Sequence, residues 1–254
     1  ALRLHAWINL EGRKPRPSEP DTASVSKYLV MLDKNPGLKS LTSIPFYADL
    51  LVQSNLAPLT GVELSEQDLI ELAIEKMCSR EYEKGTLDRD VFPPQAFREW
   101  LEEIAILSYQ ASGVSVQELR DLAGLAAVLA SRDLSEDEQK KLVDHITMAP
   151  FFKKSDMSGR LELTHELLAE YLAASRFIDF YNNSLAKFVY SLSQRPWPAD
   201  SIMYLVLGRA LKDEIDRLAT LSVSEAFSPD GFRNLIQLLA RIPKGIDVLR
   251  EKRI

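Results

Sequence analysis

The sequence predicts a mainly α-helical fold that contains one small β-hairpin. Glycine is scarce, with 10 residues in a chain of 254, and hydrophobic residues make up 46% of it. Through most of the chain apolar residues recur at the spacing of one helix face, whereas Leu161 and Leu163 alternate with charged residues as in a half-buried strand. Ser135 followed by Glu138 has the spacing of a capping box, which marks a helix start. This is the composition of a helix-leaning globular protein.

The middle of the chain has the element order of a winged helix. The predicted elements are helices at 95–110, 115–130 and 135–147, a turn at 155–159 and a strand at 160–163. Pro93 and Pro94 mark a break just before the first of these helices. Phe151 and Phe152 precede the hairpin turn. Three helices followed by a hairpin describe a winged helix.

Further helices are predicted on both sides of this region. They cover 21–32, 46–52, 65–77, 184–194, 199–221 and 229–241, and the third of them begins with Ser65 and Asp68 in capping positions. We therefore expect a first helical domain at 1–90, a winged-helix domain at 91–182 and part of a second helical domain at 183–254. Because the chain opens on Ala1 rather than methionine and ends abruptly at Ile254, we expect a fragment of a longer polypeptide.

Charge and cysteine content argue against several classes of protein. The net charge is −6, whereas nucleic-acid binders present an excess of Lys and Arg to the phosphates. The third helix of the predicted winged helix is itself acidic in its first turn, so we expect no DNA readout. The single Cys78 cannot form an internal disulfide and suits a reducing compartment. No apolar run reaches the roughly 18 residues of a membrane span, and no signal peptide is present, so we expect a cytoplasmic protein without a membrane partner.

The sequence lacks the motifs of an autonomous enzyme. It has no G-x-x-x-x-G-K-[S/T] loop and no glycine-rich dinucleotide turn, so the chain alone has no backbone cradle for phosphoryl transfer of the P-loop kind. It has no G-x-S-x-G elbow for a serine nucleophile. His5, His145 and His165 are not at metal-ligand spacing with one another or with Cys78. We expect no catalytic residue and no metal site in this chain.

The segment 160–181 joins a strand, a histidine and an amphipathic helix. Its apolar face is formed by Leu167, Leu168, Tyr171, Leu172, Ser175 and Ile178. Thr164 is the predicted N-cap, which places His165 in the first turn. A helix N-terminus offers unpaired N–H donors and the positive end of the helix dipole, so a phosphate would be stabilised there and His165 would add a donor. The residues alone favour a plainer interpretation, in which His165 only completes a cap or lies half-buried beside the strand.

Two separated stretches resemble the second half of a NACHT-type STAND nucleotide-binding module, a class of switch ATPases in innate immunity and antiphage defence. The segment LTSIPFYADLLV, residues 41–52, resembles the family's L-x-x-x-P-x-x-x-x-L-L segment. The segment LTHELLAEYLAASRF, residues 163–177, is similar to the family's F-x-H-x-(S/T)-F-(Q/R)-E-Y-L-A-A signature at the end of the winged helix. Leu163 stands where an aromatic is usual, Leu167 and Leu168 replace a polar and aromatic pair, and the P-loop half is absent.

The resemblance implies roles for two residues. Pro45 would pack against the adenine, and His165 would reach the β-phosphate of bound ADP and hold the resting state. The cofactor would be ADP or ATP, with Mg supplied by the missing P-loop domain, and this fragment alone would bind none. The partners would be the parent chain's own nucleotide-binding domain and, on activation, further copies in a homo-oligomer. The parent would then be a P-loop NTPase in signal transduction. The alternative is a stand-alone helical protein-interaction adaptor whose winged helix binds no nucleotide.

Overall fold

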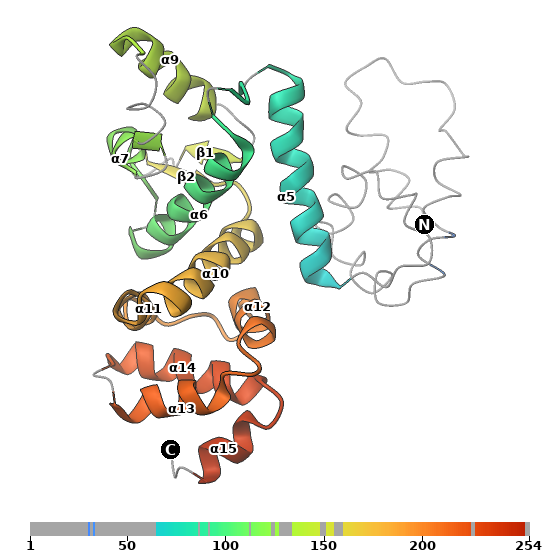
Figure 1. Ribbon diagram of the computed structural model, residues 1–254, viewed down its shortest axis with the longest axis vertical. Helices are drawn as coiled ribbons and strands as arrows, with labels where there is room; N and C mark the ends of the chain where they lie inside the picture. Colours follow the sequence, from blue (N-terminus) through green and yellow to red (C-terminus); the bar gives the residue numbers. More distant parts are fainter. Residues whose placement is uncertain are drawn as a thin grey trace. The chain divides into compact units, whose positions relative to one another are not determined.

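The computed structural model confirms a mainly helical fold with a single two-stranded sheet in the part of the chain that it describes (Figure 1). That part comprises 65–85, 87–90, 92–111, 113–122, 125–126, 134–147, 151–154, 160–224 and 227–251, together with Val30 and Asp33. Close contacts divide the chain into two compact units, 1–80 and 81–254. The predicted domain boundaries at 90 and 182 stay predictions.

Twelve elements carry labels in Figure 1 among the described residues. They are α5 (Glu66–Glu83), α6 (Pro94–Ala111), α7 (Val116–Asp121), α9 (Glu136–Thr147), β1 (Phe152–Lys154), β2 (Leu161–Leu163), α10 (Glu166–Asn183), α11 (Leu185–Leu192), α12 (Ile202–Ala210), α13 (Ile215–Ser224), α14 (Pro229–Arg241) and α15 (Gly245–Glu251). The helices predicted at 21–32 and 46–52 lie almost wholly outside the described residues. No described helix is long and apolar enough to cross a membrane.

The predicted helix starts follow from local hydrogen bonds. At the start of α5, Ser65 N–H donates to Asp68 Oδ2 at 2.8 Å and Asp68 N–H donates to Ser65 Oγ at 3.3 Å. At α7, Ser115 and Glu118 form a full capping box. These bonds satisfy backbone donors that the first turn of a helix leaves unpaired. The α5 capping pair is therefore confirmed.

Two helices predicted as continuous are interrupted. The helix predicted at 115–130 ends at Asp121, because Leu122 adopts an extended conformation with φ −63° and ψ 136°. The helix predicted at 199–221 is two helices, α12 and α13, with a turn at 211–213 between them. Glu214, just after that turn, accepts a hydrogen bond at 3.0 Å from the hydroxyl of Tyr181, which lies far back in the sequence. A long-range contact of this kind leaves no periodicity signal in the local sequence.

The hairpin β1–β2 is antiparallel, with Phe152 opposite Leu163. A third short segment joins it, because Val114 and Leu161 form an antiparallel bridge in which each N–H donates to the other's carbonyl at 2.8 Å. Arg160 fixes the same edge, since its Nε donates to Gly113 O at 2.9 Å and its Nη2 lies 2.7 Å from Glu118 Oε2. The hairpin is thereby tied to the segment between α6 and α7.

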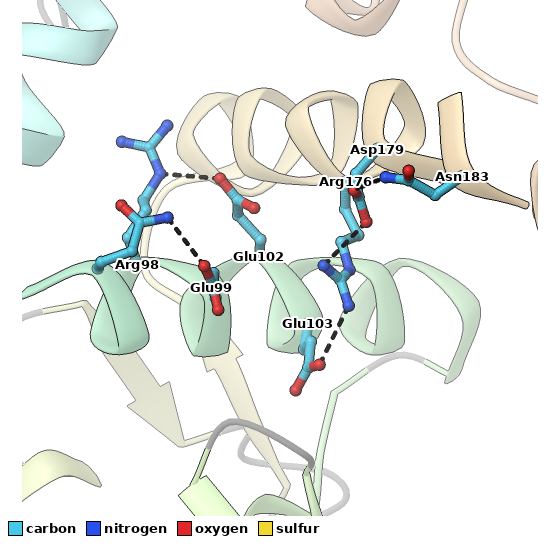
Figure 2. Close-up of polar contacts among 8 residues, drawn as sticks. Arg98, Glu99, Glu102, Glu103, Arg176, Asp179 and Asn183 are labelled. Carbon is cyan, nitrogen blue, oxygen red and sulfur yellow. Dashed lines mark hydrogen bonds and ion pairs between the residues drawn. The ribbon is translucent and has the colours of Figure 1, made fainter. Parts of the chain in front are cut away.

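Helices α6 and α10 pack side by side and form the centre of the 81–254 unit (Figure 1). Figure 2 shows the charged residues at this contact, where Arg176 of α10 reaches Glu103 of α6 at 3.2 Å and Asp179 of its own helix at 3.1 Å. Arg98 and Glu102 of α6 pair at 2.9 Å. An aromatic cluster joins α6 to the hairpin, and it is formed by Phe92, Phe97, Trp100, Phe151 and Phe152. The hairpin and α6 therefore share one core.

Helix α10 is buried on more sides than its sequence pattern predicted. The predicted face includes Leu168 and Leu172, which are buried, but it also includes residues that are only half-buried. The buried set extends to Glu170, Ala173, Ala174, Phe177 and Tyr181. The reason is that α10 packs against α6 and also against α11 and α12. A helix between several neighbours has no single apolar stripe.

Candidate functional site

The junction between β2 and α10 positions His165. Thr164 N–H donates to Phe151 O at 2.8 Å, so the hairpin pairing runs one residue beyond β2. The helix consequently begins one residue later than predicted, and the N-cap is His165, with φ −120° and ψ 122°. The prediction that Thr164 caps this helix is wrong. His165 makes no side-chain cap bond, and its carbonyl accepts the first helical bond, from Ala169 N–H at 3.1 Å.

The imidazole of His165 is held in its neutral form. Its side chain is half-buried. Burial is the largest cause that lowers the pKa of His165 below its ordinary value of 6.5, and the positive charge of Lys153 lowers it further. At neutral pH the ring therefore carries one N–H donor and one acceptor nitrogen.

The charges around His165 are mixed. Lys153 on β1 pairs with Glu162 on β2 at 3.6 Å, and both are cross-strand neighbours in the hairpin. Glu166 provides an acidic side chain in the first turn of α10, where it interacts favourably with the helix dipole. The backbone N–H groups of that first turn have no intrahelical acceptor. The junction thus places a neutral imidazole, the ammonium group of Lys153 and the N–H groups of the first helical turn near one another.

The structure does not bring the two predicted nucleotide contacts together. His165 is described, whereas Pro45 and the whole segment 41–52 lie outside the described residues. The contact of Pro45 with an adenine, and that of His165 with a phosphate, stay predictions.

A second group of polar residues was missed by the sequence analysis. A cavity of about 280 Å³ is lined by residues that include Ser108 and Tyr109 of α6, Glu170 of α10 and Arg195 after α11. Glu170 is only 5% exposed, and its Oε2 accepts the Ile202 N–H at the start of α12 at 3.0 Å. The sequence offered one signal, the carboxylate of Glu170 within the amphipathic helix, but only the packing of that helix shows that this position is internal. Arg195 was placed only in the break RPWP between two predicted helices.

Among the described residues, no group of three or more His, Cys, Asp or Glu side chains is arranged to hold a metal ion. Comparison of the chain with known protein families, curated proteins and solved structures found no match.

Proposed function

We propose that this chain is the regulatory part of a NACHT-type STAND signal-transduction ATPase, and that His165 contacts the phosphate of ADP in the resting state. The observation that carries the proposal is the position of His165, a neutral, half-buried N-cap of an 18-residue helix that directly follows a hairpin strand. An exchangeable anion contact there would link nucleotide state to the position of α10.

The element order supports a winged helix at the centre of this module. Helix α6 is followed by the Val114 bridge to β2, then by α7, α9 and the β1–β2 hairpin. The first turn of α9 carries Glu136, Asp137 and Glu138. Such a turn repels DNA phosphates, so the module is proposed to act on its own nucleotide-binding domain rather than on DNA. Helices α11–α15 would begin the second helical domain.

The proposed switch needs only a modest difference in contacts. Bound ADP would supply a diphosphate, towards which His165 would donate one hydrogen bond while Lys153 and the α10 N–H groups add favourable electrostatics. A change of a few kcal/mol between nucleotide states is enough to shift a two-state equilibrium strongly. Release of α10 would then free the module to assemble with further copies, as expected for a defence or immune signalling protein.

The first experiment is to sequence the gene for about 250 codons upstream of the codon for Ala1, the usual length of a nucleotide-binding domain. A G-x-x-x-x-G-K-[S/T] motif after a hydrophobic strand is expected. If a start codon immediately precedes the Ala1 codon, the switch proposal fails.

The second experiment measures ADP retention by the full-length protein. His165→Ala should release ADP about tenfold faster, because one net hydrogen bond is worth about 1.4 kcal/mol. Lys187→Ala, an exposed substitution on α11, is the control and should retain ADP as the parent does. Equal retention by both variants would exclude the role of His165.

The alternative function, a helical adaptor that binds other proteins without nucleotide, is favoured by one observation. Several large apolar side chains on the C-terminal helices are exposed, namely Tyr190, Leu205, Val223, Phe232 and Ile246. Val223 is the most exposed of them, at 71%. The upstream gene sequence separates the two functions, because an adaptor needs no P-loop.

A further inference from the structure

The cavity beside α6 contains three buried polar atoms without a protein partner. They are Ser108 Oγ, Tyr109 Oη and Arg195 Nε. Tyr109 is only 6% exposed, so its hydroxyl has little access to bulk water. Buried polar groups are nearly always paired in native proteins, and a cluster of three unpaired groups around one cavity requires an explanation. Each of the three can donate a hydrogen bond.

The donors are held in place by packing. The guanidinium carbon of Arg195 lies 3.5 Å from the centre of the Tyr109 ring. This stacking over the ring is favourable for a cation, and it fixes Arg195 against Tyr109. Burial raises the pKa of Tyr109 above its ordinary value, and the charge of Arg195 opposes this only in part. The phenol is therefore protonated at neutral pH and remains a donor.

Carboxylates also line the cavity. Glu170 and Glu166 of α10 both reach it, and Glu162 lines it while paired with Lys153. With Lys153 engaged by Glu162, Arg195 faces two further carboxylates. A simple dianion such as phosphate would be repelled by these groups. A ligand that carries both a negative and a positive group would match the donors and the carboxylates of the lining.

We propose that this cavity binds a small zwitterion of the α-amino-acid class. Its carboxylate would accept hydrogen bonds from Ser108, Tyr109 and Arg195, and its ammonium group would lie towards Glu166 and Glu170. Leu163 and Ala169 form an apolar wall that suits a short uncharged side chain. A cavity of about 280 Å³ is at the small end of ligand sites, which suits a ligand of amino-acid size.

The proposed ligand would bridge separate parts of the fold. Ser108 and Tyr109 belong to α6, Glu166 and Glu170 to α10, and Arg195 to the loop between α11 and α12. Binding would therefore stabilise the position of that loop against the α6–α10 pair. This site adjoins the proposed phosphate contact of His165, because Lys153 and Glu166 line the cavity, but it requires no nucleotide-binding domain.

The test is calorimetric titration of the full chain with each of the common amino acids, using matched fragments as controls. Alanine is compared with propionate, which lacks the ammonium group, and with ethylamine, which lacks the carboxylate. At least one short-chain amino acid should bind, and both fragments should bind at least tenfold more weakly. Inorganic phosphate should not compete. Absence of heat with every amino acid, as expected if only water fills the cavity, would overturn the proposal, and so would equal binding of phosphate.

Variants separate a ligand role from a structural one. Tyr109→Phe removes only the unpartnered hydroxyl, so the fold should be at least as stable while amino-acid affinity falls about tenfold. Arg195→Met should abolish binding. Gln194→Ala changes the exposed neighbour, whose side chain bonds to Tyr190 O, and should leave affinity unchanged. If Tyr109→Phe binds as tightly as the parent, the assigned ligand orientation is wrong.

Discussion

The side chain of Asn234 holds the loop that carries Arg195. Asn234 lies on α14 and is completely buried. Its Nδ2 donates to Arg195 O at 2.8 Å and to Leu192 O at 2.9 Å, while its Oδ1 accepts the Trp197 N–H at 2.9 Å. One amide thus satisfies three backbone groups that no helix or strand pairs. The placement of Arg195 in the cavity follows from this contact between distant parts of the sequence.

Asn234→Ala should lower the free energy of unfolding by about 3 kcal/mol, because it leaves several buried backbone groups without a partner. Urea unfolding followed by circular dichroism measures this value. Asn183→Ala is a matched control, since it removes an exposed amide whose one bond, to Asp179 Oδ1, is local to α10. The control should change stability by less than about 0.5 kcal/mol. Equal effects of the two substitutions would show that Asn234 does not anchor the loop.

The Glu170→Gln variant should become more stable relative to the parent as the pH rises, because the parent loses unfolding free energy and the variant does not. Burial is the largest cause that raises the pKa of Glu170 above 4.5, and hydrogen bonds from Ile202 and Ser201 lower it. The native state therefore holds this proton at pH values where the unfolded chain has lost it. The unfolding free energy of the parent falls as pH rises from 4.5 through the folded pKa, and the glutamine variant lacks this contribution.

The matched comparison for this prediction is Glu170→Ala. Glutamine keeps an oxygen that accepts the Ile202 N–H, whereas alanine leaves that buried donor unpaired at a cost of about 1–3 kcal/mol. Urea titrations of both variants at pH 4 and pH 7 distinguish the charge from the hydrogen bond. If glutamine and alanine destabilise the protein equally at pH 7, the carboxylate charge is favourable and the argument from burial is wrong.

Lys153→Gln should raise the pKa of His165 without restoring its ordinary value. Burial is the larger cause of the lowered pKa and remains in the variant, whereas the charge of Lys153 is removed. Because the folded pKa lies below 6.5, His165 makes the parent lose stability as pH falls from 6.5 through the folded pKa. The imidazole proton resonances, followed by NMR against pH, give the value directly.

Lys154→Gln is the control for the histidine titration. Lys154 adjoins Lys153 on β1, and successive side chains of a strand point to opposite faces. Its removal should therefore shift the His165 pKa less. An equal shift in both variants would mean that only the overall charge of the hairpin matters, and a parent pKa at or above 6.5 would contradict the burial of His165.

Local signals in the sequence predicted the elements well where the helix ends are set by neighbouring residues. Helix α14 has the predicted bounds. Helix α6 extends one residue beyond the prediction at each end, and α9 begins one residue later than predicted. Pro229 at the start of α14 and the predicted Ser135–Glu138 pair at the start of α9 act within one turn of the chain, and both Ser135 N–H and Ser135 Oγ bond to Glu138 Oε2. Such effects can be read from sequence because they involve residues only a few positions apart.

Features that depend on distant contacts were not predictable. The break between α12 and α13 contains no glycine or proline. The N-cap of α10 lies one residue later than predicted because Thr164 pairs with Phe151 across the hairpin. The place of His165 at the strand-to-helix junction was predicted from the change of period. The cavity was not, because Tyr109, Glu170 and Arg195 come together only through tertiary packing.

Lys244→Gly should stabilise the turn between α14 and α15, whereas Gly245→Ala should strongly destabilise it. Lys244 has φ 66°, a left-handed conformation that costs a non-glycine residue about 1–2 kcal/mol. Glycine relieves this but loses more entropy on folding, so the net gain should be about 0.5–1 kcal/mol. A Cβ at Gly245 would overlap the carbonyl oxygen of Leu239, and the resulting overpacking should cost about 2–3 kcal/mol.

Gly85→Ala separates steric overlap from backbone strain when its thermal unfolding is measured together with that of Lys244→Gly and Gly245→Ala. Gly85 also has a positive φ, of 72°, but a Cβ there would meet no atom within 4 Å. Its substitution should therefore cost only the conformational penalty, about 1–2 kcal/mol, and less than that of Gly245→Ala. If Gly245→Ala is as mild as Gly85→Ala, the start of α15 can move away from Leu239. In that case the close approach of α15 to the end of α14 is not required for folding.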